Sequence, residues 1–362
     1  MRSFVFDALP GRVVFGAGSI ELLPEELDRI GAKGVLLVYD VTSKDVADEL
    51  IERLGDRIAG TFSDVEQHVP LEAAQRAWEA ALEAGADCTV TLGGGSTTGF
   101  GKAIALEMGI PTIAIPTTYA GSEMTPIYGL TSEGRKRTGR DIRVLPKTVI
   151  YDPKLTVSLP PFVTGPSGMN ALAHCVEALY TKDANPITSL MAEEGIRALA
   201  RGLPASVAEP GSLEARTETL YGAYLAGAAL AAVGMALHHR ICHVLGGSFG
   251  LSHGDVNSVI LPHVARFNAE AVPEALERVA RAMGADDAAL ALFDLAVSLG
   301  APTSLAGLGM QETDLDRVAE ISLEEPLWNP RPVDTSDVRA ILDDAFHGRR
   351  PSRAARPSPM AS

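Results

Sequence analysis

The chain changes character near residues 155–162, and this change limits the folds that it can adopt. Before it, short apolar segments alternate with helical ones, which is typical of a mainly parallel sheet with helices on both faces. After it, strand-like segments almost vanish, and segments rich in Ala, Leu and Glu take over. We therefore predict an α/β domain over residues 1–158 and an all-helical domain over residues 159–346.

The individual elements follow from apolar runs and their periodicity. Strands are predicted at 12–15, 35–39, 61–62, 88–92 and 112–115. Helices are predicted between them at 19–30, 46–54, 71–84 and 98–108. In the second domain helices are predicted at 166–181, 186–201, 212–233, 235–247, 253–269, 272–283, 286–298, 312–320 and 335–346. The last stretch, 347–362, is basic and rich in Pro and Ser, which predicts a disordered tail.

Charge and cysteine usage exclude several classes of protein. The net charge of −15 argues against a nucleic-acid partner, because such proteins usually present a basic patch. Cys88, Cys175 and Cys242 form no CxxC pair, so neither a disulfide framework nor a zinc knuckle is predicted. No apolar run has the length of a signal peptide or a membrane span, so we predict a cytoplasmic protein with no membrane partner.

Histidines gather in one stretch, residues 236–257, which holds four of the eight in the chain. His239 and His243 are four apart, so they share one face of a helix, and His253 follows a glycine-rich turn. Imidazole rings can ligate a metal, donate a proton or donate a hydrogen bond. His238, next to the pair, either reaches the same space or points away from it.

A glycine-rich turn stands between an apolar strand and a helix. It comprises Gly93, Gly94 and Gly95, followed by Ser96 and Thr97. Glycines let the backbone approach a phosphate closely, and the amides of the following helix then face the anion. The spacing differs from GxGxxG, and an ordinary tight turn is the alternative. We predict that this turn binds the pyrophosphate of a dinucleotide.

A second polar loop, residues 116–123, follows the next strand. Its Thr117, Thr118 and Ser122 are candidates to line the ribose and nicotinamide, although such residues also build plain loops. Asp40 ends an earlier strand, where an acidic residue can bond ribose hydroxyls and repel a 2′-phosphate. The alternative is an exposed loop aspartate. The prediction is NADH as the preferred nucleotide, with NADPH as the alternative.

Four motifs occur in one order: GGGS at 93–96, PTT…GSE at 116–123, NALAHCVEALY at 170–180 and HHRICH…HG at 238–254. Together they resemble the iron-containing (group III) alcohol dehydrogenases, over about residues 10–346. The resemblance implies a dehydroquinate synthase-like fold, with a dinucleotide-binding domain, an all-helical domain and an active site in the cleft between them. It also implies a homodimer, and it matches Lys102 to a family lysine, although a solvated lysine on a helix face is the alternative.

The chain departs from the family pattern at the metal site. That family holds a divalent metal with one Asp and three His, and the matching positions are Asn170, His174, His239 and His253. Asn170 replaces the Asp. Gly99 replaces a second family Asp in GGGSxxD, and PTTYAGSE is one residue shorter than the family loop. These departures resemble the maleylacetate reductase branch of the family, which does not depend on an added metal.

The resemblance to this branch implies NADH-dependent saturation of the conjugated C=C bond of maleylacetate, giving 3-oxoadipate, in the degradation of aromatic compounds. Asn170 is a neutral amide and would bind a divalent cation weakly, so no metal is expected. Hydride addition produces a delocalised enolate, which hydrogen-bond donors can stabilise. His243 or His253 is the expected proton donor, and His174 and His239 complete the catalytic cluster with Asn170.

The substrate would be a small dianionic keto acid, which requires cationic or hydroxyl partners. The candidates are His239, His243, His253, Thr118, Tyr119 and Arg331. For Arg331 the alternative is a surface arginine. The first rival function is a metal-dependent alcohol or polyol dehydrogenase of the same fold, with iron or zinc. The second is a nucleotide-binding redox sensor without catalysis.

Overall fold

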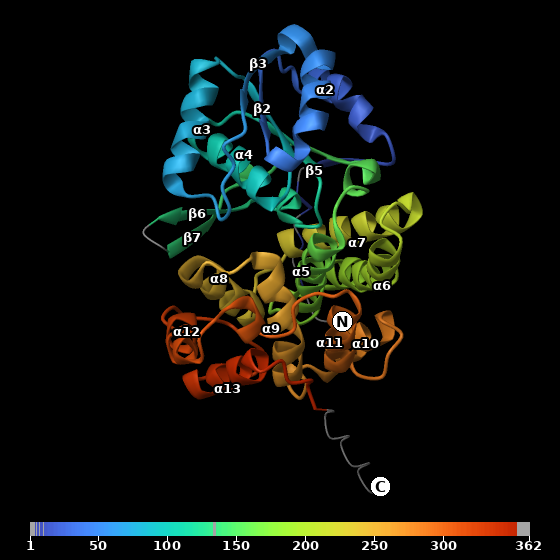
Figure 1. Cartoon of the computed structure of the whole chain (residues 1–362), viewed down its shortest axis with the longest axis vertical. Coiled ribbons are helices and arrows are strands. Elements are labelled where there is room, and N and C mark those ends of the chain that lie inside the picture. Colours follow the sequence, from blue (N-terminus) through green and yellow to red (C-terminus); the bar gives the residue numbers. More distant parts are fainter. Residues whose placement is uncertain (1–3, 5, 7, 10, 133–134, 353–362) are drawn as a thin grey trace, which may run out of the picture.

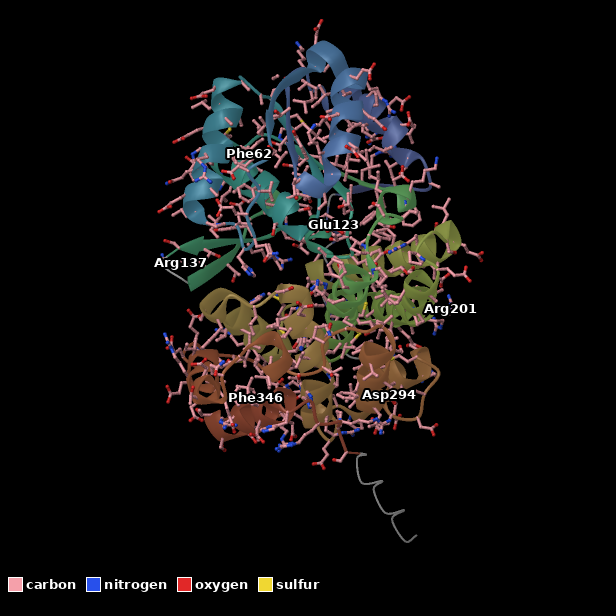
Figure 2. All side chains as sticks on the ribbon, in the orientation of Figure 1. Phe62, Glu123, Arg137, Arg201, Asp294 and Phe346 are labelled. Carbon is pink, nitrogen blue, oxygen red and sulfur yellow. The ribbon has the colours of Figure 1, made fainter. Side chains whose placement is uncertain are left out.

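The computed structural model of the chain describes residues 4, 6, 8, 9, 11–132 and 135–352. A sheet with its helices forms one part of the molecule and a set of helices forms the other, as Figure 1 shows. Side chains of both parts meet at the junction (Figure 2), where the buried Glu123 accepts a hydrogen bond of 2.7 Å from the Tyr151 hydroxyl. Burial raises the pKa of Glu123.

The main sheet is entirely parallel, with the order β1-β8-β5-β4-β2-β3. Its strands are β1 (Arg12–Phe15), β2 (Val35–Tyr39), β3 (Ile58–Phe62), β4 (Cys88–Gly93), β5 (Thr112–Pro116) and β8 (Thr148–Tyr151). The parallel sheet and five of its strands were predicted, and β8 was not. This short strand lies between β1 and β5, so pairing on both sides places it in the sheet.

Both faces of the sheet are covered by helices, as predicted. Strand β2 shows why, since all of its first four residues are apolar and alternate ones face opposite sides. Leu37 packs in one cluster with α1 (Leu23–Ile30) and α2 (Lys44–Leu54). Leu36 packs in another with α3 (Leu71–Glu83) and α4 (Gly95–Met108). A fully apolar strand is therefore the mark of a sheet buried on both faces.

A hairpin between β5 and β8 was not predicted. It pairs β6 (Ile127–Ser132) antiparallel with β7 (Arg135–Arg140), and Figure 1 shows it projecting beside the junction of the two parts. Its residues are polar, basic or half-buried, so they lack the apolar alternation that marks a strand. The pairing of β6 with β7 defines this hairpin, and no local sequence pattern predicts it.

Helices make up the second part, and each one predicted there is present. They are α5 (Pro161–Tyr180), α6 (Pro186–Ala208), α7 (Leu213–Ala231), α8 (Leu237–Phe249), α9 (His253–Asn268), α10 (Pro273–Ala282), α11 (Ala288–Ser298), α12 (Leu315–Ser322) and α13 (Thr335–Phe346). Helix α5 is buried along most of its length among α6, α7 and α9. In the described ranges, no helix combines the length and apolar character needed to cross a membrane.

Part of the predicted tail lies outside the described residues, namely 353–362. Arg350, which precedes it, donates to Asp294 at 2.6 and 2.8 Å. Arg349 pairs with Asp343 and Asp344 on α13. The ordered chain therefore continues past residue 346, where the tail was predicted to begin.

Candidate active site

A cavity of about 550 Å³ lies between the carboxyl ends of β4 and β5 and the helical part. One wall comes from the loop before α3, from the start of α4 and from the loop after β5. The other comes from α5, α8 and the start of α9. Ligands of open parallel sheets bind at this edge, beyond the carboxyl ends of the strands. The cavity is therefore the candidate active site.

The glycine-rich turn fits a phosphate. Gly93 has φ of 153°, and a Cβ there would lie 2.2 Å from Asp40 Oδ2 and 2.3 Å from Thr97 Oγ1. Helix α4 starts at Gly95 with Gly94 as its N-cap and no capping side chain, and Gly95 and Ser96 line the cavity. The first amides of α4 are thus left for an anion. Gly94 and Thr97 form part of the turn but do not line the cavity.

Asp40 connects the end of β2 to this turn. Its Oδ2 accepts hydrogen bonds from the Gly94 amide at 3.2 Å and from Thr97 Oγ1 at 3.1 Å. Its Oδ1 accepts from Thr42 Oγ1 at 2.6 Å and from Ser43 Oγ at 2.9 Å. The carboxylate therefore shapes the phosphate turn. Its contact with a ribose stays a prediction.

The loop after β5 contributes fewer residues than predicted. Thr118 and Ser122 line the cavity, whereas the Thr117 amide donates to Gly93 O at 3.0 Å and ties β5 to β4. Tyr119 is a correction, because its side chain is fully buried and its hydroxyl bonds the Arg216 guanidinium at 3.1 Å. The chain turns at this loop, so Tyr119 packs into the core between the two parts of the molecule.

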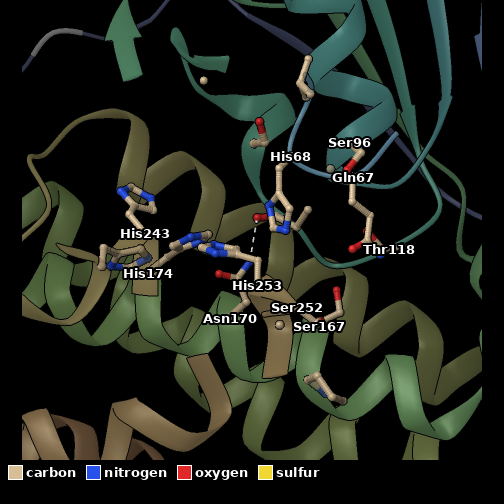
Figure 3. A pocket seen from close by; sticks show the side chains of 18 of the residues that line it. Gln67, His68, Ser96, Thr118, Ser167, Asn170, His174, His243, Ser252 and His253 are labelled. Atoms are coloured by element: carbon tan, nitrogen blue, oxygen red, sulfur yellow. Dashed lines mark hydrogen bonds between the residues drawn. The ribbon is translucent and has the colours of Figure 1, made fainter. Parts of the chain in front are cut away.

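Histidines from three helices meet on the opposite wall. Asn170 and His174 lie one turn apart on α5, His239 and His243 lie on α8, and His253 opens α9. Figure 3 shows His174, His243 and His253 close to one another. The ring centroids are 4.9 Å apart for His174 and His239, 6.3 Å for His239 and His243, and 5.9 Å for His243 and His253. The structure therefore brings together the cluster that the sequence predicted.

A glycine makes the last of these contacts possible. Gly250 ends α8 with φ of 69°, a left-handed conformation that favours glycine. The chain then reverses, and α9 begins three residues later at His253. The rings of His243 and His253 consequently stack with an interplanar angle of 24°.

Glu177 fixes the orientation of His239. His239 Nδ1 donates to Glu177 Oε2 at 2.7 Å, and both side chains are 1% exposed. The carboxylate also accepts from the amides of Ala236 and His238, each at 2.9 Å. Burial alone would raise the pKa of Glu177, but His239, His238 and these bonds together lower it. His239 Nε2 is left without a hydrogen-bond partner among the described residues.

Sequence reasoning missed Glu177, although a signal was present. Glu177 follows His174 by three residues within the quoted α5 motif, so both lie on one helix face. Burial, together with the charges of His239, His238 and His243, lowers the pKa of His174 well below its ordinary value. His238 points away from the cavity, since its Nε2 donates to Asn257 Oδ1 at 2.7 Å. Burial lowers the pKa of His238 to about 4.

The positions that match the family's metal ligands include no acidic side chain. Asn170 Nδ2 donates to Ala120 O at 3.2 Å, while its Oδ1 has no hydrogen-bond partner in the described part of the chain. Asn170, His174, His239 and His253 are all uncharged ligands, so none balances the charge of a divalent metal.

Two further sequence candidates lie outside the cavity. Arg331 is a correction: its guanidinium lies 4.1 Å from the centroid of the Phe267 ring and donates to Phe267 O, because an aromatic face is available beside it. Lys102 is buried and not on a solvated helix face. Its Nζ donates to Ser122 O, Thr125 O and Ile127 O at 2.6–2.8 Å, which holds the chain that leads from the cavity into β6. Burial lowers the pKa of Lys102 to about 7, an effect that Glu123 opposes.

One segment of the wall was missed entirely. Gln67, His68 and Val69 line the cavity, and His68 and Val69 have φ of 63° and 53°. Such angles cost of order 1–3 kcal/mol for each residue and concentrate at functional sites. No periodicity or motif marks this loop. The only sequence signal was a histidine outside the four-histidine stretch.

Three comparisons with known proteins agree with this arrangement. Models of the iron-containing alcohol dehydrogenase family match residues 10–153 and, for its C-terminal part, residues 164–346. A maleylacetate reductase of Burkholderia cepacia is 50% identical over 352 residues, which are 97% of this chain and 100% of that protein. The solved maleylacetate reductase of a Rhizobium species is 49% identical, with a TM-score of 0.92, and 97% of this chain and 100% of that one are covered. An iron-containing alcohol dehydrogenase of Corynebacterium glutamicum is 43% identical, also with a TM-score of 0.92, covering 96% and 98%.

Proposed function

The chain is an oxidoreductase of the iron-containing alcohol dehydrogenase family, and we propose that it reduces the conjugated C=C bond of maleylacetate to give 3-oxoadipate, with NADH as the reductant. One observation carries the choice within the family. The position that should hold the anionic metal ligand is Asn170, which lies among the histidines of the cavity. A full-length relative at 50% identity named maleylacetate reductase supports the same choice.

The nucleotide belongs to the wall built by the sheet. Bound NADH supplies the hydride. The amides at the start of α4 are expected to hold its pyrophosphate, and Thr118 and Ser122 are expected to face its ribose and nicotinamide. We propose NADH over NADPH because Asp40 places a carboxylate beside the phosphate turn.

The histidine wall is proposed to handle the charge that develops on the substrate. Hydride addition at the alkene carbon β to the ketone moves the electron pair onto the ketone oxygen as an enolate. Donors aimed at that oxygen stabilise the charge, and the rings of His243 and His253 line the cavity. His239 Nε2 can donate only when the ring is protonated, because its Nδ1 already donates to Glu177. A proton from His243 or His253 to the α-carbon then completes the saturation of the double bond.

The competing function is a metal-dependent alcohol dehydrogenase, a name carried by a solved structure at 43% identity. Carbonyl reduction concentrates charge on an alkoxide, which a Lewis acid stabilises. An enolate spreads its charge over several atoms, so hydrogen-bond donors suffice. We therefore propose that catalysis by this chain does not require a metal.

The test follows NADH oxidation with maleylacetate before and after exhaustive chelation, with bound metals quantified in each sample. We expect oxidation only when maleylacetate is present, and the same rate after chelation. No oxidation with maleylacetate would reject the substrate and would leave the redox sensor as the surviving rival. Complete loss after chelation, restored by iron or zinc, would reject metal independence and favour the alcohol dehydrogenase.

We also propose the cellular setting of the reaction. The substrate is the dianionic product of an aromatic-ring cleavage route, and we expect the enzyme to work in the cytoplasm as a homodimer without nucleic-acid or membrane partners. The cysteines Cys88, Cys175 and Cys242 are free and buried, which suits a reducing compartment. Light scattering of the purified chain checks the dimer.

A further inference from the structure

The cavity must hold a dianion without the usual cations. Among the described residues that line it, none is Lys or Arg, and Asp255 adds an acid. Burial raises the pKa of Asp255, with Ser252 opposing the shift. The remaining donors are hydroxyls, the carboxamides of Gln67 and Asn170, helix N-terminal amides and imidazoles. Two carboxylates at opposite ends of a six-carbon chain need such donors at two separate places, and an imidazole is the one side chain among them that can also carry a positive charge.

His68 supplies an imidazole from the wall that otherwise holds the nucleotide. It comes from the loop before α3, whereas the other histidines of the cavity come from α5, α8 and α9. A Cβ on Gly246 would lie 3.5 Å from His68 Cε1, so the ring reaches across to α8. Gly246 is three residues after His243 and shares its helix face. Figure 3 shows His68 pointing toward His253 from the opposite side.

Hydrogen bonds hold the loop that carries His68 in a strained backbone conformation. The backbone of His68 is left-handed, and its carbonyl accepts from Thr131 Oγ1 at 2.7 Å. The Val69 carbonyl accepts from the Thr131 amide at 3.0 Å, which fastens the loop to β6. Gly99 leaves room for this arrangement, since a Cβ there would lie 2.6 Å from Val69 Cγ2. The strained loop is therefore held by Thr131 and packs against Gly99, and in this conformation His68 lines the cavity.

We propose that His68 binds one carboxylate of the dianionic substrate, while the cluster on the helices binds the reacting end. His68 is thereby the residue that selects a dicarboxylate over a monocarboxylate or a neutral alcohol. The assignment rests on the proposed function for the substrate class. The geometric argument is that a fifth imidazole faces the cluster across the cavity. This argument does not depend on which bond of the substrate is reduced.

The test compares His68→Asn and His68→Gln with the parent enzyme. Asn tolerates left-handed backbone well, so His68→Asn preserves the loop. A charge-assisted hydrogen bond contributes about 1.5–3 kcal/mol, so the KM for maleylacetate should rise roughly ten- to a hundredfold. We expect kcat and the KM for NADH to stay within about twofold. His347→Asn, at the exposed end of α13, is the matched control and should change nothing.

Binding of unreactive acids separates this inference from the proposed function. Adipate and hexanoate are titrated against the NADH-bound protein, and we expect the parent to prefer adipate and the His68→Asn variant to lose that preference. This outcome can be read even if maleylacetate is not reduced. A preserved preference for adipate, a rise confined to the KM for NADH, or a fall confined to kcat would each overturn the assignment.

Discussion

The two walls of the cavity are built by different means. The wall on the sheet side works through backbone: the glycine turn, the uncapped start of α4 and the left-handed loop at His68 and Val69. The wall on the helical side works through side chains, with four histidines placed by helix spacing and by one glycine turn. Backbone amides suit a phosphate that never changes, whereas imidazoles suit a substrate that gains charge and a proton.

The comparison teaches where each kind of substitution should act. Changes on the sheet side should alter the KM for NADH or the choice of nucleotide, and His68 is the exception because it crosses the cavity. Changes on the helical side should alter kcat. Both walls depend on a carboxylate behind them, the half-buried Asp40 for the turn and the buried Glu177 for the cluster.

The largest effect is expected from the two stacked histidines. Replacing His243 or His253 with Asn, one at a time, should lower kcat about 10²–10⁴-fold for the residue that donates the proton. The other should mainly raise the KM for maleylacetate, because its ring binds the substrate. Steady-state kinetics rank them. If kcat survives both substitutions, the helical wall does not supply the proton.

A smaller loss is expected when the support of His239 is weakened. Glu177→Gln keeps the shape but removes the charge that orients the ring, so kcat should fall about ten- to a hundredfold. The KM for NADH should not change, because the nucleotide lies against the other wall. Glu218→Gln, which disturbs only an exposed pair with Arg201, is the control. An unchanged kcat with unchanged thermal stability would show that Glu177 is not a positioning residue.

A substitution in the glycine-rich turn should have the opposite kinetic effect, changing the KM for NADH and not kcat. Gly93→Ala places a Cβ 2.2 Å from Asp40 Oδ2, so the turn must shift. We expect the KM for NADH to rise about tenfold, equivalent to about 1.4 kcal/mol, with kcat retained at saturating NADH. Gly211→Ala, where a Cβ meets nothing within 4 Å, is the matched control. A loss of kcat alone would remove the distinction between the two walls.

The smallest effect is expected at Asp40. Asp40→Ser should weaken NADH and improve NADPH, shifting their ratio of kcat/KM by several-fold, because the carboxylate that repels a 2′-phosphate is gone. The shift is limited because Asp40 also holds Gly94 and Thr97, so the turn loosens for both nucleotides. Kinetics with each nucleotide measure the ratio, with Asp45→Ser as control. A constant ratio would show that Asp40 only shapes the turn.

Local sequence patterns predicted most of the helices and parallel strands, but they missed particular strands and side-chain contacts. The helices of the second part and most parallel strands follow from apolar periodicity, which is a local property. Strand β8 and the β6–β7 hairpin escaped because partners distant in the chain define them. Tyr119 was predicted to bind the substrate because a dianion requires hydroxyl or cationic partners, but its side chain is buried and its hydroxyl accepts a hydrogen bond from Arg216.

The sequence by itself determined the class of fold, the phosphate turn and the spacing of His239 and His243, because each depends on residues close together in the chain. Asn170 in place of an acid was also visible there, and it is the basis of our proposal that the histidines donate a proton and do not hold a metal. Three features became visible only in the tertiary structure. Glu177 bonds His239, the side chains of Tyr119 and Lys102 are buried, and His68 reaches α8. Those contacts link segments tens of residues apart, and packing alone decides which side chains meet.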